Sequence, residues 1–172
     1  MLKSSLFFLL FFLCVPLLWA QKRAFTIEDI YRVKYMSCPQ VSPDGRALLY
    51  TVSSSYLHET KRETHIYWMD RDGKNGRQFT FSAKSEFQPI WSPDGQKIAF
   101  LSNRENGNQI WTMPVNGGEA TCLTAWSGGI SNLVWSPDGK YIAFTTEVFP
   151  ECGADDKANQ KLSQSIAKGP VR

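Results

Sequence analysis

No charge of one sign dominates this sequence. Its 19 lysine and arginine residues stand against 16 aspartate and glutamate residues, which gives a net charge of +3 over 172 residues, and no stretch forms a basic block. Proteins that bind nucleic acid present clustered lysine and arginine to the phosphates. We therefore expect no nucleic-acid partner and no acidic partner.

Long apolar runs are absent except at the start of the chain. Lys3 is followed by the apolar run Leu6–Leu18 and then by Ala20, a small residue at a plausible cleavage point. This order predicts a secretory signal peptide over residues 1–20, cleaved after Ala20. A membrane-spanning helix needs about 20 apolar residues, so the run is too short for an anchor. The mature chain is expected to be secreted or periplasmic, with no membrane contact after cleavage.

Cysteine is scarce as well. One of the four cysteines lies in the predicted signal peptide, which leaves Cys38, Cys122 and Cys152. This odd, sparse set excludes the multi-disulfide framework that holds many small secreted domains together. The set allows one bridge, whose pairing stays open, and it leaves at least one thiol unpaired.

What the sequence does contain is a repeated tetrapeptide, Ser-Pro-Asp-Gly, at 42–45, 92–95 and 136–139. Proline presets φ at about −65°, aspartate can bond its own backbone, and glycine accepts the positive φ that closes the turn. An apolar strand follows each copy, and Trp91 and Trp135 precede the last two. Each copy therefore predicts a tight turn between two antiparallel strands.

The spacing of the copies is that of a structural repeat. They lie 50 and 44 residues apart, and the extra residues all fall in one polar hairpin, Tyr56–His65, which we expect to be longer than its counterpart at Asn103–Asn108. Each unit reads as four short strands over about 45 residues, which is typical of a β-propeller blade. A β-sandwich also has short strands, but it does not repeat this pattern at blade length.

We therefore predict an all-β fold: a partial β-propeller of about 2.5 four-stranded blades, preceded by the signal peptide and a short helix. The helix segment covers 21–37 and the incomplete propeller covers 38–172, with blades at about 41–90, 91–134 and 135–172, the last one truncated. From Glu147 onward the chain is polar, and we expect it to be irregular. A propeller needs at least about four blades to close its ring, so the chain is expected to be a fragment.

The segment before the first turn separates the families whose propellers carry this motif. Residues 25–34 have an amphipathic pattern with Thr26 as N-cap and with Glu28 and Asp29 in the first turn, where the helix dipole favours anions. The segment runs directly into the first turn, and Glu147–Cys152 follows the third turn. This succession resembles the start of secreted dipeptidyl and acylaminoacyl peptidases of the prolyl oligopeptidase (S9) family of serine peptidases.

The resemblance implies a role in peptide selection without catalysis. In that family the propeller caps a carboxy-terminal α/β-hydrolase domain, which holds the catalytic serine, aspartate and histidine, and it restricts access to peptide-sized substrates. This chain lacks that domain, so we expect no catalytic, cofactor-binding or metal-binding residue in it. The expected partners are the hydrolase domain and peptide substrates.

A Tol-type periplasmic propeller that binds proteins is the alternative. Such a protein places a whole α/β domain before its first blade. Only about twenty residues are available for it here, between the predicted signal peptide and the first blade. The peptidase resemblance is therefore favoured.

Ser127 is the serine whose surroundings come closest to a nucleophile motif. Residues 125–129 read Ala-Trp-Ser-Gly-Gly, close to the G-x-S-x-G elbow of α/β-hydrolases. That elbow needs a strand, a turn and a helix around it and a histidine downstream, whereas both histidines of this chain lie upstream. The repeat register places Ser127 opposite Ala83, in the connection between two blades. We therefore predict a loop residue and no nucleophile.

Two further groups of residues are candidates for a binding site. A possible metal set on the long hairpin matches no zinc spacing, so solvated side chains are expected there; its members are His58, Glu59, Glu63 and His65. Four tryptophans at fixed positions in the repeat are expected to pack between blades rather than to stack on a ligand: Trp68, Trp91, Trp111 and Trp135.

Overall fold

The computed structural model describes residues 23–57, 59, 61–105 and 107–168. The signal peptide predicted for residues 1–20 therefore lies outside the described residues. Within the described part, no helix is long and apolar enough to cross a membrane.

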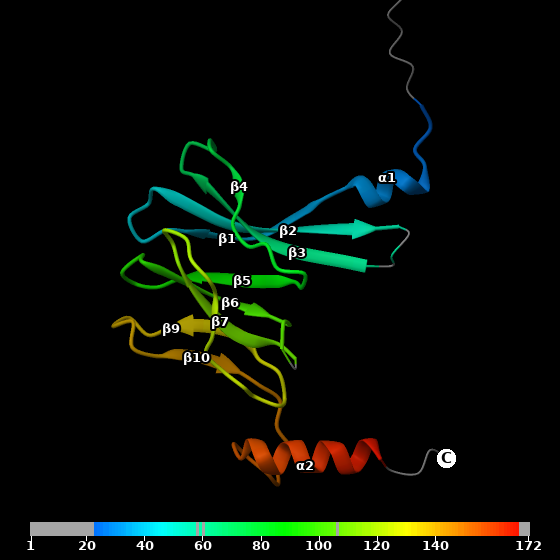
Figure 1. Cartoon of the computed structure of the whole chain (residues 1–172), viewed down its shortest axis with the longest axis vertical. Helices are drawn as coiled ribbons and strands as arrows, with labels where there is room; N and C mark the ends of the chain where they lie inside the picture. Colours follow the sequence, from blue (N-terminus) through cyan, green and yellow to red (C-terminus); the bar gives the residue numbers. More distant parts are fainter. Residues whose placement is uncertain (1–22, 58, 60, 106, 169–172) are drawn as a thin grey trace, which may run out of the picture.

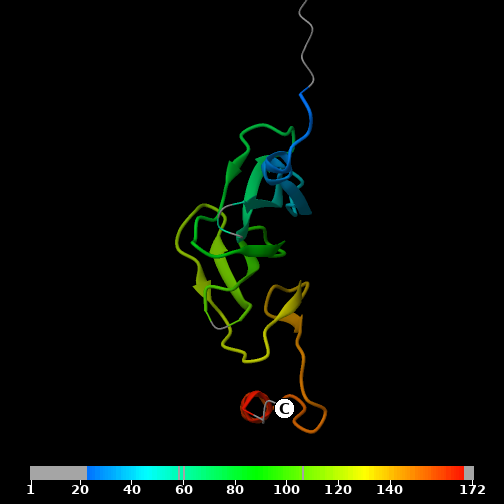
Figure 2. The same cartoon turned by 90° about the vertical axis from the view of Figure 1, so that its right-hand side faces the viewer.

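Three antiparallel sheets stacked on one another form the body of the molecule (Figure 1). Sheet A contains β1 (Tyr35–Val41), β2 (Ala47–Tyr56), β3 (Lys61–Asp70) and β4 (Arg77–Gln78). Sheet B contains β5 (Glu86–Trp91), β6 (Lys97–Ser102), β7 (Gln109–Pro114) and β8 (Thr121–Cys122), and sheet C contains β9 (Ser131–Trp135) and β10 (Ile142–Thr145). Helix α1 (Ile27–Arg32) precedes sheet A, and α2 (Asp156–Ala167) lies beyond sheet C at the opposite end (Figure 2).

Each strand pairs with the next strand in the sequence, so sheets A and B are both four-stranded meanders. Such meanders, stacked one after another, are the blades of a β-propeller. Two four-stranded sheets and one two-stranded sheet confirm the predicted fold, an all-β partial propeller of about 2.5 blades. The domain boundaries given above remain predictions.

The Ser-Pro-Asp-Gly turns share one set of hydrogen bonds. In each copy the serine hydroxyl donates to the aspartate two residues on, at 2.6, 2.5 and 2.6 Å, and the glycine has a φ of 70°, 68° and 70°, which only glycine adopts without strain. Successive turns also touch. A Cβ on Gly95 would lie 3.6 Å from Cδ of Pro43, and one on Gly139 would lie 3.7 Å from Cδ of Pro93. The turns therefore stack from blade to blade.

The first strand of each sheet is irregular at the same repeat position. Cys38, Gln88 and Asn132 have φ values of 52°, 51° and 53°, and the pairings of β1 and β5 shift register there. The side-chain oxygen of Gln88 accepts a hydrogen bond from the backbone N–H of Asn132 at 3.1 Å. The repeat thus includes a backbone feature that links neighbouring blades.

The core lies between the sheets, and β6 shows how it is built. Ile98 and Phe100 belong to the cluster between sheets A and B, whereas Ala99 and Leu101 belong to the cluster between sheets B and C. Alternate side chains of a strand point to opposite faces, so a strand covered on both sides must be apolar throughout. The tryptophans pack as expected, Trp111 within the first cluster, Trp68 and Trp91 against it, and Trp135 against the second.

The hairpin predicted to be longer than its counterpart in the next blade is longer, and its extra length is mostly strand. β2 and β3 are ten residues long each and pair without interruption from Ala47–Asp70 to Tyr56–Lys61, whereas β6 and β7 have six residues each. Polar side chains do not prevent pairing, because the ladder is made by the backbone. They reinforce it here, since the hydroxyls of Ser53 and Thr64 form a 2.8 Å hydrogen bond across the strands.

The irregular structure expected from Glu147 onward is also wrong over α2. Asp155 caps this helix, because its carboxylate accepts a hydrogen bond from the N–H of Ala158 at 3.1 Å. Alanine, lysine, glutamine and leucine, all strong helix formers, make up much of the segment. The segment thus forms a capped helix in spite of its polar composition.

The amino-terminal helix forms where it was expected. Thr26 is its N-cap, and the backbone N–H of Thr26 donates to the carboxylate of Asp29 at 2.9 Å. The carboxylate of Asp29 also pairs with Arg23. The hydrogen bond from Arg23, aided by the one from Thr26, lowers the pKa of Asp29 to about 2.

Candidate functional site

Ser127 lies in the connection between β8 and β9, where the repeat register predicts it. Its hydroxyl donates to the carboxylate of Asp156 at 2.5 Å, and its backbone N–H donates to the same oxygen at 2.9 Å. A nucleophilic serine needs a base that accepts its proton and a third group that orients the base. The one histidine in the described part, His65, lies on β3 and has other partners. The structure therefore gives Ser127 an anchoring role at the start of α2.

The residues weighed as metal ligands do not form a metal site in the described part of the chain. His58 lies outside the described residues. Glu63 and His65 lie on β3, where the His65 Nε2 is 3.9 Å from a Glu63 oxygen. Their side chains are only 18% and 16% exposed, so the expectation of solvated side chains is wrong for both. Among the described residues no group of three or more His, Cys, Asp or Glu side chains is placed to hold a metal ion.

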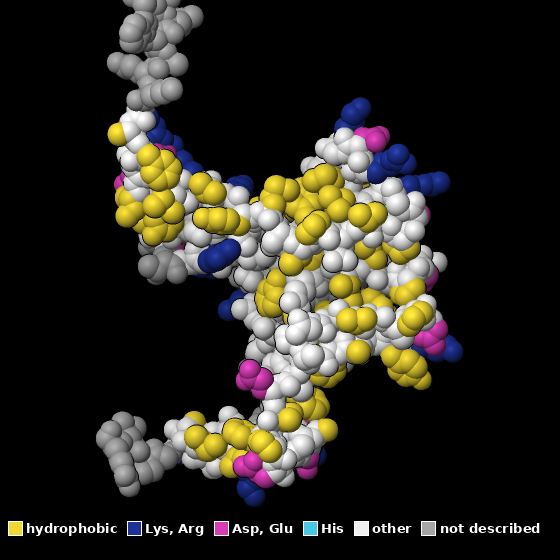
Figure 3. Space-filling model, turned by 180° about the vertical axis from the view of Figure 1, so that it is seen from behind, with side chains coloured by type: hydrophobic (Ala, Val, Ile, Leu, Met, Phe, Trp, Pro, Cys, Tyr) yellow, Lys and Arg dark blue, Asp and Glu magenta, His cyan; other side chains and the backbone are white. Residues whose placement is uncertain are grey.

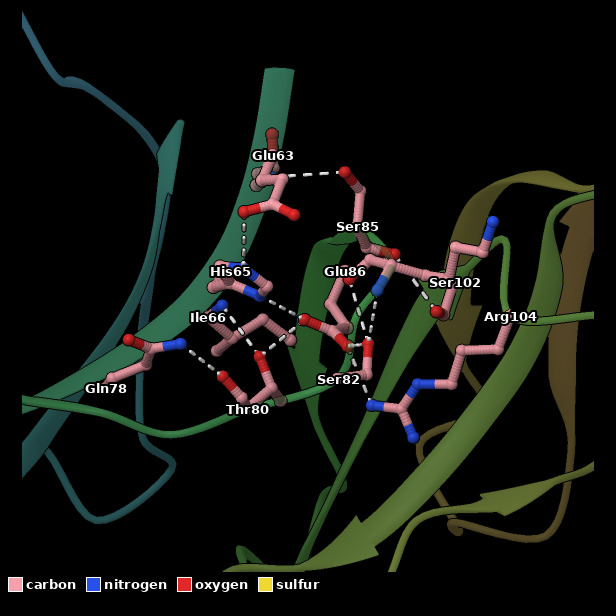
Figure 4. A network of polar contacts seen from close by, with 12 residues as sticks. Glu63, His65, Ile66, Gln78, Thr80, Ser82, Ser85, Glu86, Ser102 and Arg104 are labelled. Carbon is pink, nitrogen blue, oxygen red and sulfur yellow. Dashed lines mark hydrogen bonds and ion pairs between the residues drawn. The ribbon is translucent and has the colours of Figure 1, made fainter. Parts of the chain in front are cut away.

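His65 instead contacts a buried carboxylate, Glu86, at the start of β5 (Figure 4). The Glu86 side chain is fully buried, and one of its oxygens lies 2.7 Å from the Nδ1 of His65 and accepts from the hydroxyl of Thr80 at 2.9 Å. The other oxygen accepts from Arg104 at 2.8 Å and from the hydroxyl of Ser82. We call these five residues the Glu86 cluster.

The Glu86 cluster joins sheet A to sheet B. His65 comes from β3 of sheet A, Arg104 follows β6 of sheet B, and Thr80 and Ser82 lie in the connection between the sheets. A carboxylate offers about four acceptor positions, and here three donors and the Nδ1 of His65 lie at them. Glu86 is therefore saturated, and its chemistry is that of a structural ion pair rather than of a general base.

Arg104 is held by aromatic rings as well as by Glu86. Its guanidinium carbon lies 4.9 Å from the ring centre of Trp111 and 5.7 Å from that of Phe100. Cations over aromatic faces are stabilised by the ring quadrupole. The Arg104 guanidinium, which neutralises Glu86, is thus held in place both by the carboxylate and by the two rings.

At the equivalent position of the repeat, sheet B has a hydrogen-bond network of uncharged side chains. The repeat places Gln109 opposite His65 and Thr124 opposite Thr80. The Thr124 hydroxyl donates to the Gln109 side-chain oxygen at 2.8 Å, as the Thr80 hydroxyl donates to Glu86. Both threonine hydroxyls also accept from the N–H of an isoleucine in the third strand at 3.0 Å. The threonine is part of the repeat, whereas the ion pair is particular to the junction of sheets A and B.

Sequence reasoning missed Glu86, although a signal exists. The repeat aligns Glu86 with Ile130, which is 2% exposed in the second core cluster. A carboxylate at a position that the next blade fills with a buried isoleucine must find partners or destabilise the fold. This mismatch between Glu86 and Ile130 in the aligned repeats can be recognised from the sequence alone.

The described part of the chain has three open recesses of comparable size. One, of about 650 Å³, lies between the first two Ser-Pro-Asp-Gly turns and is walled by Trp68 and Trp91. Another, of about 590 Å³, lies between α2 and residues 147–149. The third, of about 660 Å³, lies between residues 122–127 and the start of α2. The three described cysteines, Cys38, Cys122 and Cys152, are free thiols.

The aspartates of the turns beside the first recess are tied into the turn itself. Asp94 accepts hydrogen bonds from the Ser92 hydroxyl at 2.5 Å and from the N–H of Gln96 at 3.0 Å. These bonds, the serine first, lower the pKa of Asp94, and the equivalent bonds do so for Asp44 and Asp138. The carboxylates therefore stabilise the turns in their charged form.

The fold agrees with comparison against known proteins. Residues 22–167 match the family model PD40, the TolB beta propeller domain. The chain belongs to this propeller family. Because the match covers most of the chain, the sequence itself, and not only the shape of the fold, relates this chain to the propeller family.

The relatives of this propeller include peptidases. Over 112 residues the chain is 35% identical to the uncharacterized peptidase YuxL of Bacillus subtilis, which covers 64% of this chain and 17% of the relative. It is 28% identical, also over 112 residues, to dipeptidyl-peptidase 5 of Porphyromonas endodontalis, covering 65% of this chain and 16% of the relative. The chain thus spans about a sixth of the length of these relatives. The resemblance to peptidase propellers is confirmed.

Solved structures also connect the propeller to the Tol system. The structure of a putative TolB from Agrobacterium tumefaciens superimposes with a TM-score of 0.54 at 28% identity, covering 67% of this chain and 39% of that chain. The propeller is therefore related both to peptidases and to TolB.

Proposed function

We propose that this chain is the amino-terminal propeller part of a secreted serine peptidase of the prolyl oligopeptidase family. In this role it gates the access of peptides and is not catalytic by itself. Its partners are then an α/β-hydrolase domain elsewhere in the parent protein and the peptide substrates. The signal peptide predicted for residues 1–20 supports a secreted or periplasmic location.

The similarity to two peptidases over the same length of propeller carries this proposal. The geometry of Ser127 is compatible with it, because a serine bonded to Asp156 serves the structure of the propeller. The Glu86 cluster likewise stabilises the contact between blades. The chemistry of the proposed parent therefore belongs to residues outside this propeller.

A protein-binding propeller of the TolB kind is the second candidate. It is favoured by the TolB structure at 28% identity, whose likeness extends over 67% of this chain. In that case the parent would bind protein partners and hydrolyse nothing.

A fluorophosphonate probe, which labels activated serines, tests the choice between the two. The 172-residue chain and the complete reading frame that contains it are expressed side by side and treated with the probe. We expect the complete protein to be labelled at a serine outside this chain and to cleave peptides, and the chain alone to stay unlabelled. A complete protein that adds only further blades, takes no label and cleaves no peptide would support the TolB-like role instead.

A further inference from the structure

The recess beside α2 has the form of a groove with two unlike walls. Its lining comes from the loop after β8, the segment after β10 and one side of α2: Ser127, Gly128, Glu147, Val148, Phe149, Asn159, Gln160, Ser163 and Gln164. Its volume of about 590 Å³ falls within the range of about 300–1,000 Å³ that is common for ligand sites. None of these residues belongs to the Glu86 cluster.

The groove is held in shape by hydrogen bonds that tie α2 to the rest of the chain. Besides the bonds from Ser127 to Asp156, the backbone N–H of Phe149 donates to the Asn159 side chain at 2.7 Å. The amide of Asn159, which is 5% exposed, donates in turn to the carbonyl of Gly153 at 2.8 Å. The helix is therefore fixed against the segment that forms the opposite wall.

Gly128 brings the two walls close together. A Cβ at this position would lie 2.9 Å from the carbonyl oxygen of Glu147, closer than side-chain carbons approach backbone oxygens. The absence of a side chain thus permits the loop to pack directly against residue 147.

The helical wall presents free hydrogen-bonding groups. Gln160, Ser163 and Gln164 are exposed and lie three and four residues apart, on one face of α2. Within the described part of the chain their side chains have no hydrogen-bond partner. Glutamine amides both donate and accept, which matches the alternating N–H and C=O groups of an extended peptide.

The other wall supplies an apolar surface and a charge. Val148 is 42% exposed and Phe149 is half-buried, so a bound side chain could cover both. Glu147 is exposed at the edge of the groove and has no ion-pair partner among the described residues. An unpaired carboxylate favours a cationic ligand and disfavours an anionic one.

We propose that this groove binds an extended peptide segment whose backbone bonds the amides of Gln160 and Gln164. An apolar side chain of the peptide lies on Val148 and Phe149, and a lysine or arginine side chain pairs with Glu147. The proposal rests on the proposed function, because it gives the gated peptide a binding place on the propeller itself.

Fluorescence anisotropy with two matched probes tests this assignment. The probes are the dye-labelled peptides Gly-Lys-Leu-Gly-amide and Gly-Glu-Leu-Gly-amide, titrated with the 172-residue chain. We expect the lysine peptide to bind at least about fivefold more tightly than the glutamate peptide, a difference that 0.5 M NaCl reduces because it screens the charge. The double variant Gln160→Ala, Gln164→Ala should weaken the binding of both peptides about tenfold, since the hydrogen bonds to the peptide backbone are lost and only partly replaced by water.

Two single variants separate charge from position. Glu147→Gln should abolish the preference for lysine and leave the binding of the glutamate peptide unchanged or stronger. Lys161→Ala changes an exposed residue of α2 outside the groove and should alter neither affinity by more than about twofold. Circular dichroism establishes that all variants keep the helix and strand content of the parent chain.

Three results would overturn the proposal: no binding at up to about 200 μM chain, equal loss of affinity in Lys161→Ala and in the double variant, or competition by free lysine as strong as by unlabelled peptide. These results leave the fluorophosphonate experiment untouched. If the complete protein is labelled but no peptide binds the groove, only the groove proposal is rejected. If a peptide binds the groove but the complete protein is not labelled, only the proposed peptidase function is rejected.

Discussion

At the scale of single residues, Glu86 and the turn aspartates use carboxylates in different ways. Glu86 is fully buried and neutralised by Arg104, which is itself packed against two aromatic rings. Asp94 is exposed and holds its own turn through the Ser92 hydroxyl. Glu86 acts between blades and Asp94 acts within a turn. Substitutions at the two positions should therefore differ in how much they change the free energy of unfolding and in how that change depends on pH.

Removing the buried carboxylate should destabilise the fold strongly. Glu86→Ala leaves the mostly buried guanidinium of Arg104 without its partner, and we expect a loss of about 3–5 kcal/mol in the free energy of unfolding. Urea unfolding followed by tryptophan fluorescence measures it. Glu119→Ala, which removes an exposed carboxylate, is the matched control and should stay within about 0.5 kcal/mol. A loss below about 1 kcal/mol for Glu86→Ala would show that the cluster does not hold the sheets together.

Removing the serine donor should raise the pKa of Asp94. The Ser92 hydroxyl is the main cause of the lowered pKa, so Ser92→Ala should move it back toward its ordinary value. A lowered carboxyl pKa stabilises the fold above the pKa of the unfolded chain, and this stabilisation is lost as the pH falls through the folded pKa. Carbon-13 NMR titration of the carboxyl groups gives the measurement, with Asp138 as internal reference. An unchanged Asp94 titration would contradict the role given to the hydroxyl.

At the scale of elements, α2 is an addition to the blade pattern. It is held to the blades through Ser127, Phe149 and the buried Asn159, while most of its surface is exposed. The strands, in contrast, share two apolar cores. The helix should therefore open without the sheets, since local stability follows local burial.

Asn159→Ala should loosen α2 and leave the sheets intact. The substitution leaves the N–H of Phe149 and the carbonyl of Gly153 without their side-chain partner, which costs about 1–3 kcal/mol locally. Hydrogen exchange should speed up about tenfold or more over Asp156–Ala167 and stay constant in β6. Equal acceleration in both elements would mean that helix and sheets unfold as one unit.

At the scale of the whole molecule, the stacked sheets expose apolar surface at both ends. Figure 3 shows hydrophobic side chains gathered over α1 and along α2, and Phe25, Ile27 and Ile166 are 72%, 61% and 61% exposed. Strand β10 pairs only with β9 among the described residues, so its other edge is open. Open edges and exposed apolar patches promote association between chains.

The 172-residue chain should therefore associate as its concentration rises. Light scattering after size exclusion should show a mass that grows between about 10 and 200 μM. Val134→Lys places a charge on the exposed side of β9, where Val134 is 62% exposed, and should shift the chain toward monomer. Lys140→Arg keeps the charge of a nearby exposed residue and should change nothing. A mass that stays that of the monomer over this range would contradict the prediction.

The residues of the turns predict much of the fold by themselves. Proline, aspartate and glycine restrict the backbone locally, so three copies of one tetrapeptide indicated the turns, the strands around them and the length of the repeat. The same register placed Ser127 between blades and predicted the packing of the four tryptophans. Local signals also exist for α2, whose cap Asp155 was overlooked because the segment is polar.

What the sequence alone determined is therefore the repeat: an all-β propeller of about two and a half blades. Only the tertiary structure decided which residues meet between repeats. Glu86 bonds His65 and Arg104, which lie 21 residues before it and 18 after it, and the groove joins residues from three separate segments. Turn chemistry acts over a few residues and can be read from order, whereas these contacts depend on how whole sheets and a helix pack together.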